Sequence, residues 1–218
     1  MILYIYGANG AGIEIYDLAQ RVNQVENRYS KIICIDDFEE EIEFYGTHRI
    51  HFSSCESYAN GEEFEFIIAV GEPSARELLY NRVLDAGYKL TTLVDPSAIV
   101  SPTAKLSQGC IVQAQSVVSS NVVVGENCML LLSTIVGHDA VMGKHCVQCP
   151  KSTVGGKSVV GDKCFIGLAS SMKQGVCLGD RVIVGMGSMM FKDVESDSTV
   201  IGNPARVTKG NNEHKVFN

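Results

Sequence analysis

Hydrophobic residues recur at every sixth position through the second half of the chain, from Val94 to Met190. Sixteen of the seventeen positions in this register are apolar, and the exception is Gln148. Small or β-branched residues stand four positions after most of them, and glycine often follows them directly. Neither the 3.6-residue period of an α-helix nor the two-residue alternation of a strand gives this spacing. The register predicts a hexapeptide β-helix, in which each hexad supplies one short strand and one turn, and three hexads close a triangular coil.

The beginning of the chain follows a different pattern. Residues 2–6 form an apolar run typical of a buried strand, and residues 13–22 show helical spacing after a glycine-rich loop. Residues 31–35 and 64–70 are predicted to form two further strands, with another helix after the second of them. Strands that alternate with helices predict a small parallel sheet of the Rossmann-like βαβ kind.

We therefore expect two domains and a tail. The predicted α/β Rossmann-like domain covers residues 1–93, the predicted parallel β-helix covers 94–209, and a polar, frayed tail covers 210–218. Hexapeptide β-helices are usually left-handed, so we expect that hand here. Charge supports the division, because residues 1–93 contain 16 acidic and 7 basic residues, whereas the remainder contains 9 and 11.

The composition excludes several classes of function. The 218-residue chain is 45% hydrophobic and 20% charged, and its net charge of −7 disfavours binding to nucleic acid or to an anionic membrane. No apolar run reaches the roughly 18 residues of a membrane span, and the first residues show no signal-peptide pattern. The acidic balance favours a small-molecule partner. Cys146 and Cys149 have the C-x-x-C spacing, but nothing in the chain suggests export to an oxidising compartment, so we expect a cytoplasmic protein with free thiols.

The spacing of the β-helix points to one candidate catalytic residue. Residues eighteen apart stack on successive coils, about 4.8 Å from each other. His138 stands in a turn shortly before the break in register at Gln148, and Gly156 lies eighteen residues after it. Acyl transfer needs a neutral imidazole to remove a proton and an N–H to stabilise an oxyanion, and Asp139 or another carboxylate would orient the ring. The alternative is an ordinary histidine in a surface turn.

Two other ladders of residues have simpler interpretations. Four cysteines occupy the small-residue position of the hexads, where a thiol is a good buried filler: Cys110, Cys128, Cys146 and Cys164. Lys163 and Arg181 share a turn position and are candidates for contact with the phosphates of a nucleotide-bearing acyl donor. Basic residues are also common in solvated turns, which is the alternative for this pair.

The glycine-rich loop carries the candidate binding chemistry of the first domain. Asn9, Gly10 and Ala11 lie in this loop between a predicted strand and a predicted helix, where backbone N–H groups meet phosphates. Asp36 and Asp37 follow the second strand, near where an acidic side chain meets a ribose or a base edge. The spacing G-x-x-G-x-G and the small domain argue against an NAD enzyme. A tight turn without ligand and a solvated strand end are the alternatives.

The combination of these motifs resembles a family of sugar O- and N-acyltransferases. This family includes sialic acid O-acetyltransferase and the UDP-4-amino-sugar N-acetyltransferases of bacterial glycan synthesis, and the resemblance covers nearly the whole chain. The matching stretches are Tyr4-Ile5-Tyr6-Gly7-Ala8-Asn9-Gly10, Cys34-Ile35-Asp36-Asp37, Ile67-Ile68-Ala69-Val70-Gly71, Asp95-Pro96-Ser97-Ala98, Gly137-His138-Asp139 and Ile201-Gly202-Asn203-Pro204-Ala205-Arg206.

The resemblance implies a role for each matching residue. His138 would be the general base with Asp139 as its neighbour, and Gly156 would offer its N–H to the carbonyl of acetyl-CoA. The family's nucleotide-sugar site would be lined by Asn9, Gly10, Asp36, Asp37 and Gly71.

The resemblance also implies a groove for CoA and an oligomer. Gly167 and Leu168 would lie along the CoA groove, and the enzyme would be a homotrimer with active sites between subunits. This chain departs from the family at Ala11, where the loop usually has histidine, and at Val147, where a second histidine usually follows the base.

We therefore expect an acetyl-CoA-dependent N-acetyltransferase without a metal. Its substrate would be the amino group of a nucleotide-linked 4-amino-4,6-dideoxy sugar in bacterial glycan or O-antigen synthesis. O-acetylation of a sialic acid or related hydroxyl is the near alternative, and a non-catalytic scaffold for sugar nucleotides is another. A zinc enzyme would need three histidine ligands, whereas the predicted β-helix contains only His138 and His145.

Overall fold

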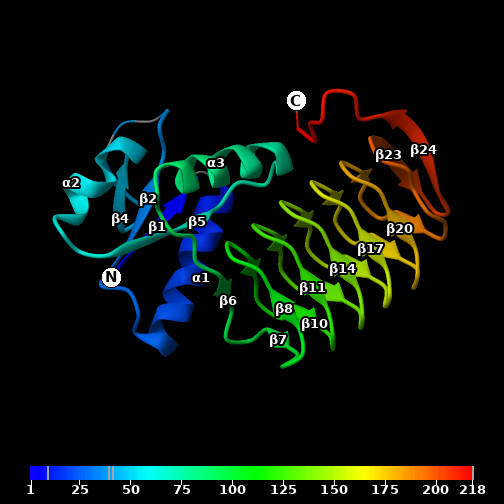
Figure 1. Ribbon diagram of the computed structural model, residues 1–218, viewed down its shortest axis with the longest axis horizontal. Helices are drawn as coiled ribbons and strands as arrows, with labels where there is room; N and C mark the ends of the chain where they lie inside the picture. Colours follow the sequence, from blue (N-terminus) through cyan, green and yellow to red (C-terminus); the bar gives the residue numbers. More distant parts are fainter. Residues whose placement is uncertain (9, 39, 41, 218) are drawn as a thin grey trace.

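The computed structural model describes residues 1–8, 10–38, 40 and 42–217, and an α/β domain packs against one end of a long parallel β-helix (Figure 1). The described strands of the α/β domain form one sheet in the order β3-β4-β2-β1-β5, parallel except for β3 against β4. These strands are β1 (Ile2–Tyr6), β2 (Lys31–Ile35), β3 (Ile42–Phe44), β4 (Thr47–Ile50) and β5 (Phe64–Ile68). The helices are α1 (Gly10–Glu26), α2 (Cys55–Ala59) and α3 (Pro73–Asp85), with a 3₁₀ turn at Phe52–Ser54.

Strand β1 is buried on both faces, which explains its unbroken run of apolar residues. Leu3 and Ile5 pack in one cluster with Leu18 of α1. Tyr4 belongs to a second cluster with Tyr80 of α3. The sheet is therefore covered by helices on both sides, as in other α/β domains.

The β-helix consists of two-residue strands that pair with strands eighteen residues away, such as Val117 with Ile135. Sheet 1 contains β6 (Leu93–Val94), β9 (Ile111–Val112), β12 (Met129–Leu130), β15 (Val147–Gln148), β18 (Phe165–Ile166), β21 (Ile183–Val184), β23 (Ser198–Gly202) and β24 (Ala205–Gly210). Sheet 2 contains β7 (Ile99–Val100), β10 (Val117–Val118), β13 (Ile135–Val136), β16 (Thr153–Val154), β19 (Ser171–Met172) and β22 (Met189–Met190). Sheet 3 contains β8 (Lys105–Leu106), β11 (Val123–Val124), β14 (Val141–Met142), β17 (Val159–Val160) and β20 (Cys177–Leu178). The predicted fold class, an α/β domain followed by a hexapeptide β-helix, is confirmed.

The interior of the β-helix is filled by the residues of the sixfold register. Every apolar register position from Val112 to Met190 is buried. Gln148 also points inward, where its amide nitrogen donates to the carbonyl of Ile135 at 3.2 Å and to that of Ser152 at 3.1 Å. The four cysteines of the ladder are buried, and each thiol donates to a carbonyl fifteen residues further on, at 2.9 to 3.2 Å. The ladder therefore fills the coil corners, as the sequence predicts.

The outward side of sheet 1 is the surface on which the α/β domain packs. Ile111, Met129 and Val147 point out of the β-helix, yet all three are buried in the cluster that contains α1. These outward residues hold the α/β domain against the β-helix through apolar contact.

A buried arginine completes this junction. Arg76 of α3 is fully buried, and its Nη1 donates to the carbonyls of Ile68 at 2.7 Å and Val70 at 3.0 Å. Its Nε and Nη2 donate to the carbonyl and side-chain oxygens of Asn127 at 2.9 and 2.7 Å. Burial lowers the pKa of Arg76 to about 10, so the guanidinium remains charged at neutral pH.

The last described residues, 211–217, return from the far end of the β-helix to the start of α3 (Figure 1). The sequence predicts a frayed tail there, whereas the structure gives these residues hydrogen bonds at both ends. No helix in the described part of the chain is long and apolar enough to cross a bilayer.

Candidate active site

His138 lies in the turn between β13 and β14, at the corner where sheets 2 and 3 meet. Its Nδ1 is 2.8 Å from Oδ2 of Asp139, and Asn121 Nδ2 donates to the other carboxylate oxygen at 3.0 Å. The hydrogen bond with His138 and that from Asn121 hold the pKa of Asp139 below its ordinary value. With Nδ1 assigned as the donor to this carboxylate, Nε2 keeps its lone pair and can accept a proton.

Gly156 lies directly against the His138 ring, as the eighteen-residue spacing predicts. A Cβ atom at position 156 would stand 2.8 Å from His138 Nε2, so a side chain there would displace the ring. The N–H of Lys157 donates to the carbonyl of His138 at 2.8 Å, which joins the two turns. No acceptor among the described residues pairs with the Gly156 N–H. The imidazole ring thus lies against a residue whose N–H has no partner among the described residues, at the surface, where the histidine side chain is 53% exposed.

We call Asn121, His138, Asp139 and Gly156 the His138 corner. The break in register at Gln148 is not part of this corner, because its side chain lies inside the β-helix. Its hydrogen bond to the carbonyl of Ile135 instead supports, from within, the strand that ends just before the His138 turn.

The α/β domain contains a cavity of about 480 Å³, which we call the α/β cavity. It lies beyond the carboxyl ends of β1, β2 and β5, where open parallel sheets bind their ligands. Four of the residues predicted for a nucleotide-sugar site line it: Ala11, Asp36, Asp37 and Gly71. Gly10 begins α1 and is not among the lining residues, and Asn9 lies outside the described residues.

Two glycines of the predicted phosphate loop are required by packing alone. A Cβ atom on Gly12 would lie 1.9 Å from the carbonyl oxygen of Gly7, because α1 starts close to the end of β1. Gly7 has a φ of 120°, which side-chain-bearing residues rarely adopt. The tight strand-to-helix turn therefore explains the glycine pattern, and only the cavity supports a bound ligand.

Asp37 sits in a network of protein contacts at the edge of the α/β cavity. Its Oδ1 accepts a hydrogen bond from Phe52 N at 2.9 Å, and its Oδ2 accepts from the Tyr6 hydroxyl and from Arg82 Nη1, the latter at 2.6 Å. Burial raises the pKa of Asp37, but the hydrogen bonds from Tyr6 and Phe52 and the Arg82 charge outweigh it and lower the pKa overall. The carboxylate therefore stays ionised and fixes the Arg82 guanidinium at the cavity.

Sequence reasoning missed two residues of the α/β cavity. Arg82 lies on the same face of α3 as Ala75 and Leu78. The seven-residue spacing between Ala75 and Arg82 was the signal in the sequence that could have indicated this. Phe38 is 98% exposed beside the cavity, and the Asp36 carboxylate accepts a hydrogen bond from its N–H at 2.9 Å. An aromatic side chain so exposed stands out only once the fold is known.

The two candidate sites lie on different sides of the chain. The α/β domain packs on sheet 1, whereas the His138 corner lies where sheets 2 and 3 meet. Gly167 and Leu168 follow β18, at the corner between sheets 1 and 2, so within one chain they do not adjoin His138. A Cβ atom on Gly167 would lie 2.5 Å from the carbonyl oxygen of Val184, which shows that coil stacking alone requires this glycine.

The two basic turn residues considered for phosphate binding are already paired. Lys163 Nζ lies 2.9 Å from Glu77 of α3, and Arg181 makes two hydrogen bonds of 2.6 and 2.8 Å to Asp197. The hydrogen bonds to Asp197 raise the pKa of Arg181. Because their charges are balanced, these side chains hold α3 and the turns in place, and the structure gives no support for a phosphate contact.

His145 is buried at the junction between the two parts of the chain. Its Nδ1 lies 3.0 Å from Nδ2 of Asn127, and its ring meets the Tyr80 ring edge-on at 5.2 Å between centroids. Burial lowers the pKa of His145. In the described part of the chain, no group of three or more His, Cys, Asp or Glu side chains is placed to hold a metal ion.

We expect the protein to lose stability in mild acid because of His145. Its folded-state pKa is below the unfolded value of about 6.5, so unfolding takes up a proton and the free energy of unfolding falls as pH drops below about 6.5. One proton gives a slope of at most about 1.4 kcal/mol per pH unit. Urea denaturation at a series of pH values from 7.5 to 5 measures this slope. His145→Asn keeps an acceptor for Asn127 and tolerates the φ of 57° there, so this variant should show a smaller slope. An unchanged slope would contradict the assignment.

Comparison with known proteins agrees with this architecture. Residues 2–83 match the model of the PglD N-terminal domain, and residues 158–190 match that of the hexapeptide repeat of succinyl-transferase. The acetyltransferase domain of PglB from Neisseria gonorrhoeae FA1090 is 27% identical, with a TM-score of 0.88 over 95% of this chain and 99% of that chain. The same domain is also known in complex with acetyl coenzyme A.

Two further structures share the fold. One is a histidine-to-asparagine mutant of perosamine N-acetyltransferase from Caulobacter crescentus in complex with CoA and GDP-perosamine. It is 22% identical, with a TM-score of 0.86 over 96% of this chain and 97% of that chain. The other is WeeI from Acinetobacter baumannii AYE, 24% identical, with a TM-score of 0.89 over 95% of this chain and 100% of that chain. The chain thus joins an N-terminal domain of the PglD type to a left-handed hexapeptide-repeat β-helix, the architecture of the acetyltransferase structures to which it is similar.

Proposed function

We propose that this protein transfers the acetyl group of acetyl-CoA to the amino group of a nucleotide-linked 4-amino-4,6-dideoxy sugar. The observation that carries the proposal is the contact between the His138 ring and Gly156, which joins a base to a free backbone donor. The complex of the related PglB domain with acetyl coenzyme A supports the acyl donor. The GDP-perosamine complex of the perosamine enzyme supports an amino-sugar nucleotide over a hydroxyl acceptor.

In this mechanism each residue of the His138 corner acts on a defined atom. His138 Nε2 takes the proton of the sugar amine as its nitrogen attacks the thioester carbonyl. The N–C bond forms, the C–S bond breaks, and the proton passes from the ring to the sulfur of CoA. The Gly156 N–H donates to the carbonyl oxygen as negative charge develops there. Asp139, held by Asn121, keeps the ring oriented and stabilises its protonated form.

We assign the two halves of the reaction to the two parts of the chain. Residues 1–93 would bind the nucleotide, and the α/β cavity has the size of ligand pockets for small molecules. Asp36, Asp37 and Gly71 belong to its wall. The β-helix over 94–209 would carry acyl transfer, and 210–218 would follow as a tail. We place the reaction in the cytoplasm, because the eight cysteines are free thiols, as in a reducing compartment.

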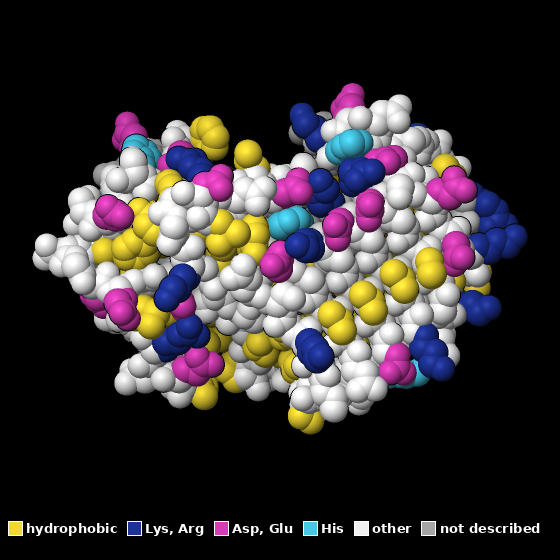
Figure 2. Space-filling view, viewed as in Figure 1, with side chains coloured by type: hydrophobic (Ala, Val, Ile, Leu, Met, Phe, Trp, Pro, Cys, Tyr) yellow, Lys and Arg dark blue, Asp and Glu magenta, His cyan; other side chains and the backbone are white. Residues whose placement is uncertain are grey.

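We further propose that the active enzyme is a homotrimer whose sites lie between subunits. Within one chain, the α/β cavity and the His138 corner lie on different sides. In this proposal the site is complete only when a neighbouring copy brings its α/β cavity to the His138 corner. In that arrangement Gly167 and Leu168 of one copy would border the CoA groove beside the His138 corner of the next. Figure 2 shows a row of hydrophobic side chains across the coils of the β-helix. Sheet 3 exposes such a row, which a second copy would cover: Val123 at 39%, Val141 at 42% and Val159 at 43%.

Mixed oligomers should regain activity from two inactive variants. His138→Ala removes the base, and Ala11→Phe places a ring into the α/β cavity. Any cyclic trimer that contains both kinds of chain has one intact interface, so it should show about one third of the wild-type turnover. Differential affinity tags isolate the mixed species, and light scattering gives its mass. Mixed oligomers with no activity would mean that base and cavity act within one chain.

The function itself is tested by release of free CoA. The assay offers acetyl-CoA with UDP-, dTDP- and GDP-linked 4-amino sugars, their hydroxyl counterparts and sialic acids. Turnover on one amino sugar, lost in His138→Ala, is the expected result. Activity on hydroxyl acceptors alone would favour an O-acetyltransferase, and sugar-nucleotide binding without CoA release would favour the non-catalytic scaffold.

A further inference from the structure

The C-terminal residues 211–217, which we call the strap, connect the two ends of the molecule. At the far end of the β-helix, Asn211 Nδ2 donates to the carbonyl of Arg181 at 2.9 Å, and His214 Nε2 lies 3.2 Å from Asp197. At the near end, the N–H groups of Val216 and Phe217 donate to Oε2 of Glu72 at 2.9 and 3.1 Å. Seven residues are therefore held at both of their ends.

The near end of the strap touches the wall of the α/β cavity. Glu72 and Gly71 follow β5, and Gly71 lines that cavity. A Cβ atom added to Gly71 would stand 3.9 Å from Cε2 of Phe217, so the Phe217 ring lies close to this loop. On its other side the ring packs edge-on against Phe165 of sheet 1, at 5.5 Å between centroids. Phe217, which is 56% exposed, thus lies between the β-helix and the cavity loop.

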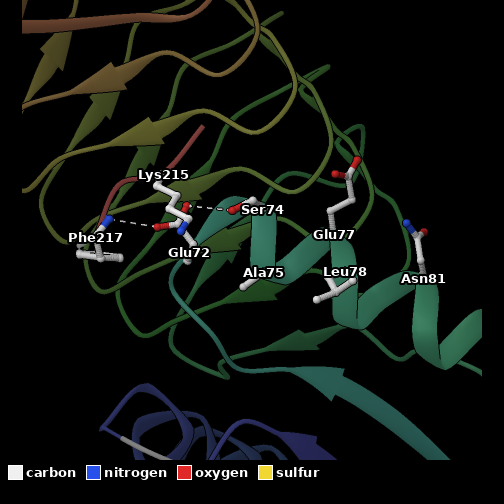
Figure 3. Close-up of a pocket in the computed structure, with 8 residues that line it drawn as sticks. All are labelled: Glu72, Ser74, Ala75, Glu77, Leu78, Asn81, Lys215 and Phe217. Carbon is white, nitrogen blue, oxygen red and sulfur yellow. Dashed lines mark hydrogen bonds between the residues drawn. The ribbon is translucent and has the colours of Figure 1, made fainter. Parts of the chain in front are cut away.

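The strap also forms one side of a second hollow of about 580 Å³, which we call the α3 groove. Figure 3 shows Lys215 and Phe217 of the strap beside Glu72, with Ala75 and Leu78 further along α3. Ala75 and Leu78 line both the α3 groove and the α/β cavity. A ligand that binds in the α/β cavity but is longer than the cavity would therefore extend into the α3 groove and meet the strap.

The charges of the α3 groove favour an anionic segment of that ligand. Its two carboxylates are already satisfied, Glu77 by Lys163 and Glu72 by the N–H groups of the strap. The Lys215 ammonium makes no ion pair with any residue that the structure describes, and only its backbone N–H is bonded, to Asn211. An ammonium that is paired with neither of these carboxylates is available to bind a phosphate group.

We propose that the strap is part of the substrate site. Lys215 binds the diphosphate of the nucleotide-linked sugar, and Phe217 is a positioning residue that holds the Gly71 loop against the bound nucleotide. This inference rests on the proposed function and extends it to residues that the sequence pattern did not indicate. Binding of the nucleotide then also orders the strap, because the ligand adds a contact at the end that Glu72 already holds.

Calorimetric binding of nucleoside diphosphates tests the strap apart from catalysis. UDP, GDP and dTDP are titrated into the wild-type protein, and the tightest binder is then the probe. Lys215→Met should raise its Kd about fivefold and weaken the dependence of Kd on salt. Phe217→Ala should raise Kd severalfold, and Phe217→Tyr should restore it. Matched controls away from the groove are Lys209→Met and Phe191→Ala, which remove the same groups from exposed positions and should leave Kd unchanged.

Hydrogen exchange gives a second readout in the wild-type protein. The N–H groups of Val216 and Phe217 should exchange more slowly when the probe is bound. If the strap variants bind the probe as tightly as their controls, or if the probe leaves hydrogen exchange unchanged, only the proposed role of the strap is contradicted. Failure of all three nucleotides to bind would contradict the strap and the proposed function together. Strap-dependent binding without CoA release would contradict the acetyltransferase function only.

Discussion

Replacing His138 by alanine or asparagine should lower kcat for acetyl transfer by about 10²- to 10⁴-fold, the usual effect of losing a general base. The free energy of unfolding should change little, because the side chain is half exposed and its one hydrogen bond lies at the surface. Nucleotide affinity should also be preserved, since the α/β cavity lies on another side of the chain. Steady-state CoA release and urea denaturation on the same preparations measure both.

Asp139→Asn separates orientation of the ring from proton transfer. The amide still occupies the left-handed turn and still meets Asn121, but it offers the ring no negative charge. We therefore expect a smaller loss than for His138→Ala, of about tenfold to a hundredfold, with folding intact. Near-normal turnover in His138→Ala would exclude the proposed mechanism. Equal losses in both variants would instead assign the carboxylate a direct part in the chemistry.

The β-helix could be predicted in detail because a repeated coil turns spacing in sequence into position in space. The eighteen-residue distance between His138 and Gly156 placed them in contact, and the structure has the imidazole nitrogen 2.8 Å from where a Cβ of Gly156 would be. The same rule accounts for Asn121 beneath Asp139, which was not singled out from the sequence. In the α/β domain, the glycine-rich loop and the end of the second strand indicated Ala11, Asp36 and Asp37, and the family resemblance added Gly71. All four line one cavity.

Contacts between distant segments could not be predicted in this way. Nothing periodic relates Arg76 to Asn127, or Glu72 to the strap, because each contact depends on how the α/β domain packs on sheet 1. The polar residue Gln148 in the apolar register has a structural explanation that the sequence did not indicate. Its amide nitrogen donates to two carbonyl groups inside the β-helix, those of Ile135 and Ser152.

The junction between the two parts of the chain should depend strongly on Arg76. Arg76→Met keeps much of the side-chain volume but leaves four oxygen atoms of Ile68, Val70 and Asn127 without their donor. We expect the free energy of unfolding to fall by roughly 2–4 kcal/mol, or the melting temperature by roughly 2–4 °C per kcal/mol. Calorimetry should show the α/β domain melting before the β-helix. Arg206→Met, at an exposed position of β24, is the matched control.

A double-mutant cycle with Asn127 decides whether the two side chains act as one unit. Asn127 has a φ of 55°, so Asn127→Gly removes the side chain without straining the backbone. If the guanidinium and the amide stabilise the junction together, the double variant should cost much less than the sum of the single variants, because the second change removes a partner already lost. Additive losses would mean that Arg76 acts mainly through the carbonyls at the end of β5, and that Asn127 serves its own coil and His145.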